Sequence, residues 1–302
     1  MIWLFIVLAA YFLISINLTL DKVILKNSLP HPAVYCFYMG ILSIFGLVFA
    51  PFGVIDFNAK EVVTGILVGA FFLLPLYFMY KAVFENEATR VGPLIGAVTP
   101  IFVWLFSFLF LGERFTPGGI IVFLLLVAGG FLISVDLNGE ERNLKRKKVI
   151  SMLKIAVLAA FMFGIYYALL KYVYEEDTFV SGFVWTRLGS FLAAFVFLLS
   201  AKNRRLIFGE SKTLKPKTGV LVAANKTLSG IAFALLNYAI AIGSVTLVNA
   251  MQGLQYVFLL IMVAILSYKY PHILTEAVSR KSLTQKIIAV TLIGLGLAMI
   301  AL

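Results

Sequence analysis

Residues 92–135 read GPLIGAVTPIFVWLFSFLFL, GERFT and PGGIIVFLLLVAGGFLISV, which are two apolar stretches joined by a short connection. A helix that crosses a bilayer needs about 20 predominantly apolar residues, and each stretch supplies roughly that length. Because lipid offers no hydrogen bonds, such a segment must satisfy its backbone groups internally, as a helix does. This part of the chain therefore predicts two consecutive transmembrane helices.

Similar apolar stretches follow one another along the whole chain. The 302 residues are 62% hydrophobic and 13% charged, whereas a soluble protein is about 25% charged. This small number of charged residues cannot cover a water-facing surface. Most of the protein's exterior must therefore face lipid. The predicted fold class is an all-α integral membrane protein, retained in the membrane from its first span onward. The ten predicted spans are Ile2–Leu20, Ala33–Ala50, Val62–Tyr80, Gly92–Leu111, Pro117–Val135, Ile155–Tyr174, Phe179–Ala201, Gly219–Ile242, Ser244–Tyr268 and Ile287–Leu302.

Several other classes of protein are disfavoured. The net charge of +11 lies mostly in short segments between spans, and no zinc-finger spacing or Gly-rich phosphate loop accompanies it, so a nucleic-acid partner is not expected. The single cysteine, Cys36, and the two histidines, His31 and His272, do not form the ligand spacing of a metal site. No nucleophile–base pair appears in the spans, so neither catalytic residues nor a cofactor are expected.

The chain divides into two comparable halves. Residues 87–114 and 243–270 align at low identity, and each half contains five predicted spans. An odd number of spans per repeat makes the second copy enter the membrane in the opposite direction. We therefore predict two inverted five-helix repeats at 1–135 and 155–302, joined by a basic connecting loop at 136–154. Within the first half, the pairs Gly65/Gly69 and Gly92/Gly96 predict close approaches of helices.

Short motifs in this arrangement resemble a known family. The fourth span ends in Leu111-Gly112-Glu113-Arg114, Lys22 follows the first span, and Ala82 precedes the fourth. Together with Trp185-Thr186-Arg187 early in the seventh span, these residues make the chain similar to the EamA-type transporters of the drug/metabolite transporter superfamily. The second half departs from the pattern, because residues 266–269 read LSYK where LGER would stand.

The resemblance implies a fold and an activity. Members of this family have ten helices in two inverted halves around a central cavity, and they move small organic solutes by alternating access. Their cargo includes amino acids, other metabolites and nucleotide sugars, so the resemblance does not name a substrate.

Two cations begin deep within predicted spans. Arg187 lies about 12 Å and Lys226 about 10 Å along its helix from the start of the span, at 1.5 Å per residue. A charge at such depth is costly and usually faces a cavity or a partner. Each could instead snorkel to an interface or pair with a loop carboxylate such as Glu175 or Asp177.

Other polar residues in the spans extend this group. Asn249, Gln252 and Tyr256 share one face of the ninth span, and they either line the cavity or bond to neighbouring helices. The predicted substrate-binding residues are Arg187, Lys226, Asn225, Trp185, Asn249, Gln252, Gln255, Tyr256, Asn17 and Tyr80.

The basic residues also predict an orientation. With ten spans, twenty Lys and Arg residues fall on one side and three on the other. The positive-inside rule then places the basic side in the cytoplasm and both termini outside, whereas the family resemblance implies termini inside. We follow the charge bias.

The function predicted from these residues is secondary transport of a small polar solute, anionic or zwitterionic, across the cytoplasmic membrane, more by export or exchange than by uptake. Two alternatives stay open. A flippase for a lipid-linked sugar or phosphate could use the same cations for a headgroup, and a membrane-embedded enzyme represents a different class.

Overall fold

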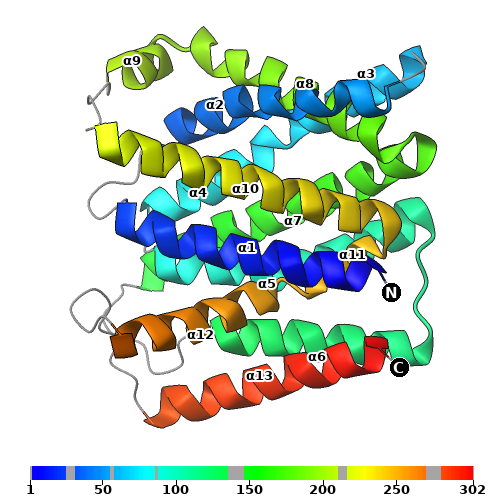
Figure 1. Ribbon diagram of the computed structural model, residues 1–302, viewed down its shortest axis with the longest axis vertical. Helices are drawn as coiled ribbons and strands as arrows, with labels where there is room; N and C mark the ends of the chain where they lie inside the picture. The colour runs from blue at the N-terminus through cyan, green and yellow to red at the C-terminus, as the bar shows by residue number, and fades with distance from the viewer. Residues whose placement is uncertain are drawn as a thin grey trace.

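A computed structural model describes residues 2–24, 31–54, 58–85, 88–134, 146–209, 216–269 and 280–301, and within these ranges the secondary structure is helical. The helices run across one bundle, and the two ends of the chain lie at the same end of it (Figure 1). The elements are α1 Ile2–Ile24, α2 Pro32–Leu42, η1 Ser43–Phe52, α3 Ala59–Phe71, α4 Leu73–Glu85, α5 Ala88–Leu111, α6 Pro117–Ser134, α7 Arg146–Glu176, α8 Phe179–Ala194, η3 Phe195–Leu199, α9 Ala201–Gly209, α10 Pro216–Ile242, α11 Val245–Ala250, α12 Gly253–Lys269 and α13 Arg280–Ala301.

Eight stretches in the described ranges are long and apolar enough to cross a membrane. The predicted span at 117–135 lies in α6, whose apolar part, Pro117–Ile133, is shorter than these eight. The predicted span at 219–242 lies in α10 and is not among the eight. The chain is thus a multi-pass helical membrane protein, and the full set of ten spans stays a prediction.

Large apolar side chains are exposed around the bundle. Phe5, Phe45, Leu67 and Leu199 are each more than 60% exposed, which in water would be an aggregation hazard. When these side chains face lipid tails, their exposure carries no free-energy penalty, because lipid is as apolar as they are. The exterior therefore agrees with a membrane environment.

Several predicted spans are broken or end in a different helix type. The third span divides at Phe72 into α3 and α4, and the ninth divides at Met251 and Gln252 into α11 and α12. Pro75 lies three residues after the first break, and its missing N–H leaves one carbonyl of the preceding turn unbonded. The second and seventh spans each continue from an α-helix into a 3₁₀ segment, η1 and η3.

The sixth span starts earlier than predicted. Helix α7 begins at Arg146, so residues 146–154 of the predicted connecting loop are helical, while 136–145 lie outside the described residues. The long stems of cations at the membrane edge let a helix extend past its apolar part, because their charged ends can reach water.

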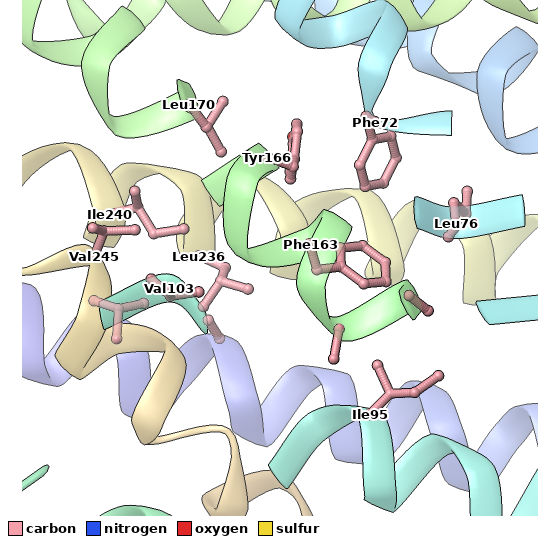
Figure 2. Packing of buried hydrophobic residues seen from close by; sticks show 14 of the residues in the cluster. Phe72, Leu76, Ile95, Val103, Phe163, Tyr166, Leu170, Leu236, Ile240 and Val245 are labelled. Carbon is pink, nitrogen blue, oxygen red and sulfur yellow. The ribbon is translucent and has the colours of Figure 1, made fainter. Parts of the chain in front are cut away.

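The main helix contacts join the parts of the chain before and after the connecting loop. Helix α1 packs on α10, α5 on α7, α6 on α13 and α3 on α8. Figure 2 shows part of the resulting apolar core, to which the earlier part contributes Phe72 and Ile95 and the later part Tyr166 and Leu236. The ring centres of Phe72 and Tyr166 are 4.9 Å apart. The core therefore lies between the two parts rather than within either one.

The crossing of α3 and α8 is unusually tight. A Cβ atom on Gly69 would overlap the backbone carbonyl of Thr186, and one on Gly189 would overlap that of Ile66. The hydroxyl of Ser190 also donates a hydrogen bond of 2.7 Å to the carbonyl oxygen of Gly69. The close approach predicted from Gly65 and Gly69 is confirmed, and it fixes the part of α8 that carries Arg187. At the other predicted pair, a Cβ on Gly96 would meet the Gln252 side chain at 3.0 Å and one on Gly92 would meet nothing within 4 Å.

Candidate functional site

Arg187 lies inside the bundle with only 5% of its surface exposed. Its Nη2 atom donates a hydrogen bond of 3.2 Å to the hydroxyl of Tyr166 on α7, and its Nε atom is buried without a hydrogen-bond partner among the residues that the structure describes. An unpaired buried donor on a charged group is costly and calls for an explanation. Arg187 does not snorkel to an interface.

Aromatic rings surround the guanidinium group. The Cζ atom of Arg187 lies 4.6 Å from the ring centre of Phe233 and 5.4 Å from those of Phe72 and Phe183. The break between α3 and α4 places Phe72 there, and the lack of a side chain at Gly46 leaves room for the stem of Arg187. The faces of these rings attract a cation, which offsets part of its lost hydration.

No carboxylate in the described part of the chain forms an ion pair with Arg187. Glu175, one of the partners predicted for it, instead lies 3.5 Å from Lys171, whose Nζ also donates to the carbonyl oxygen of Ala241. Burying a cation without an opposite charge costs several kcal/mol in proteins, of which ring contacts return about 2. Arg187 is therefore a buried cation whose charge no described carboxylate balances.

Lys226 lies in a second polar group. It is half-buried on α10, and its Nζ is 5.9 Å from the ring centre of Tyr35, whose ring is 3.7 Å from that of Tyr80. Beside it, the amide of Asn17 donates to both the backbone and side-chain oxygens of Asn225. Thus α1, α2, α4 and α10 bring together four of the predicted site residues.

The two groups are separated along α10. Phe233 contacts Arg187 and Lys226 contacts Tyr35, and these two α10 positions, seven residues apart, are separated by about 10 Å along the helix. The structure thus has two cationic positions on α10 and its neighbours, each with its own aromatic contacts.

The polar residues of the ninth span are arranged differently from the prediction. The break at Met251 and Gln252 divides the face that Asn249, Gln252 and Tyr256 were predicted to share. Asn249 donates to the Val245 carbonyl of its own helix, Gln252 lies against Gly96, and buried Gln255 adjoins Tyr256. Tyr256 lines a small pocket with Gly96, Pro100, Leu126 and Gly130.

Trp185 was predicted to line the cavity, and its Cβ lies at the α3–α8 crossing. A Cβ on Gly65 would be 2.6 Å from it. The stem of Trp185 therefore helps to form the crossing that holds Arg187 in place.

Glu113 links the two parts of the chain, a role that the sequence did not suggest. Helix α5 ends at Leu111, and Gly112 takes a positive φ of 67°, which glycine adopts readily. The Glu113 carboxylate then accepts hydrogen bonds from the hydroxyl of Ser244 and, at 2.5 Å, from that of Thr246. The LGER motif thus fastens the end of α5 to the start of α11.

The residues around Arg187 were not predicted from the sequence. Tyr166, Phe72, Phe183 and Phe233 come from four separate parts of the chain and look like ordinary apolar residues of a membrane helix. Only the deep cation itself signalled that aromatic partners had to lie nearby.

Comparisons with known proteins agree with the fold. Residues 1–135 match the model of a family described as the EamA-like transporter family. A solved structure, titled only as the crystal structure of a protein, has a TM-score of 0.70 at 19% sequence identity and covers 99% of this chain and 98% of its own. No curated protein matches the chain. The resemblance drawn from the motifs is confirmed over residues 1–135, the part of the chain that matches the EamA-like transporter family.

Proposed function

We propose that the protein is a secondary transporter that moves a small anionic or zwitterionic metabolite across the cytoplasmic membrane by alternating access, through export or exchange. The observation that carries this proposal is the buried guanidinium of Arg187, which lies between the two parts of the chain with no carboxylate paired to it in the described residues. A solute anion visiting the site would supply the missing charge.

The enclosure of Arg187 favours a solute over a lipid. Three phenylalanine rings surround the guanidinium, and Arg187 is 5% exposed. A lipid headgroup with its tails attached would have to push these rings apart along its whole path. The flippase is therefore the second candidate. The match of residues 1–135 to a transporter family supports transport over the enzyme alternative.

The arrangement of two inverted repeats, at 1–135 and 155–302, is part of this proposal. Two observations support it. The second helix of each proposed repeat passes from α-helix into a 3₁₀ segment at a comparable point. The strongest helix contacts also join one proposed repeat to the other, as expected when a cavity lies between them.

Ligand binding to the purified protein tests the proposed substrate class. We expect anionic and zwitterionic metabolites, screened at constant ionic strength, to raise the melting temperature, because ligand at 100 times its Kd stabilises a protein by about 2.7 kcal/mol. Equal stabilisation of Arg187→Gln by the same compounds would show that they bind elsewhere. A response confined to cations, neutral solutes or lipid-linked sugars would overturn the proposed class.

The orientation proposed from the charge bias can be tested with cysteine labelling. In a variant that lacks Cys36, a cysteine at Asn203 in α9, beside Lys202 and Arg204, should be shielded from impermeant thiol reagents in intact cells. A cysteine at exposed Asn58, at the end of the bundle opposite α9, is the matched control and should react (Figure 1). The reverse pattern would place both termini inside.

A further inference from the structure

We infer that the Tyr166 hydroxyl occupies, in the empty carrier, the edge of Arg187 that receives a monocarboxylate group of the solute, and that the carboxylate replaces this hydroxyl when the solute binds. The inference rests on the proposed transport function and adds the chemistry of the group that is bound. Tyr166 then acts as a built-in competitor of the solute.

The geometry of the guanidinium carries the first step. The N–H of Nε and one N–H of Nη2 point in the same direction, and together they form an edge that fits the two oxygens of a carboxylate. In this structure Nη2 holds the Tyr166 hydroxyl at 3.2 Å, and Nε is buried without a partner. In our proposal the hydroxyl takes the Nη2 position of this two-point edge, while the Nε position has no partner among the described residues.

Charge balance selects the ligand. A phenol hydroxyl does not neutralise the guanidinium, and the nearest groups around it are the rings of Phe72, Phe183 and Phe233. A monocarboxylate would balance the single positive charge, whereas a phosphate dianion would leave a net negative charge among apolar rings. Lys226, seven positions before Phe233 on α10, has its ring contact with Tyr35.

The ring of Tyr166 is held in place independently of its hydroxyl. Its side chain is fully buried, and its ring centre lies 4.9 Å from that of Phe72 and 5.2 Å from that of Tyr167. Figure 2 shows Tyr166 on α7 facing Phe72. Tyr166→Phe therefore removes the competing oxygen and retains the packing.

The test is a titration of the purified full chain with acetate, replacing chloride at constant ionic strength, with the melting temperature as readout. We expect Tyr166→Phe to melt below wild type without acetate and to reach half-saturation at about a tenfold lower acetate concentration. The tenfold figure is the effect of one hydrogen bond to a charged group on a binding constant. Tyr166→Met, which fills the volume without an oxygen, should show the same gain.

Matched controls separate the outcomes. Tyr167→Phe changes a neighbouring ring on the same helix and should titrate like wild type, and Tyr166→Phe/Arg187→Gln should lose the gain. Inorganic phosphate in place of acetate should show no gain in Tyr166→Phe. Acetate affinity in Tyr166→Phe that is equal to or weaker than in wild type would overturn the inference.

This result is distinguishable from failure of the proposed function. Arg187→Gln could lose transport while Tyr166→Phe shows no gain in acetate affinity. That combination would overturn only the competitor role of Tyr166. An acetate gain combined with unchanged transport in Arg187→Gln would show instead an anion site that transport does not use.

Discussion

Gly69→Ala is expected to destabilise the purified protein by about 3 kcal/mol, because the added methyl group would overlap the backbone carbonyl of Thr186. A backbone carbonyl cannot turn aside as a flexible side chain can, so α3 and α8 would have to separate. Their separation would also lengthen the hydrogen bond from Ser190 to the Gly69 carbonyl and shift Arg187 away from its aromatic partners. Thermal unfolding in detergent measures the effect.

Gly230→Ala is the matched control for this variant. It adds the same methyl group to a glycine within a helix, α10, at a position with nothing within 4 Å of the new atom. Its stability should equal or slightly exceed that of wild type, because alanine favours a helix over glycine by about 1 kcal/mol. Equal melting temperatures for Gly69→Ala and Gly230→Ala would contradict the tight crossing.

The class of fold could be predicted from the sequence because lipid imposes a simple rule on it. Apolar stretches of helical length are visible one at a time, and they indicated the apolar helices without knowledge of their contacts. The polar helix α9, in a segment expected to be a loop, gave no such signal. The breaks at Phe72 and at Met251–Gln252 could not be read in this way. A break depends on whether neighbouring helices satisfy the freed backbone groups, and that is a property of the assembled bundle.

The site was predictable in part for a related reason. A charge such as Arg187 is expensive in a span wherever it lies, so its importance is visible in the sequence. Its partners Tyr166, Phe72 and Phe233 can lie in any span without a large free-energy penalty. Nothing in the sequence therefore distinguishes them from residues that face lipid. The same limit applies to Asn249, whose amide bonds within its own helix, and to Glu113, whose partners lie more than 130 residues away along the chain.

Arg187→Gln is expected to lower transport by about one to two orders of magnitude, since a hydrogen bond to a charged group contributes about 1.5–3 kcal/mol. Glutamine retains polar atoms but lacks the charge that would attract the solute anion. Arg187→Lys keeps the charge and loses the planar, two-point donor edge, so it should fall between glutamine and wild type. Arg187→Gln should melt close to wild type, because removing a buried cation that no described carboxylate balances offsets the loss of its hydrogen bond to Tyr166 and of its ring contacts.

The most direct measurement of the central claim is exchange of an identified anionic solute by proteoliposomes that contain equal amounts of wild type and Arg187→Gln. Equal melting temperatures of the two proteins would first establish that both are folded. The account predicts rapid exchange by wild type, little exchange by Arg187→Gln, and intermediate exchange by Arg187→Lys. Equal exchange rates for wild type and Arg187→Gln would contradict it, because Arg187 would then be a structural residue and the anionic cargo would lose its principal support.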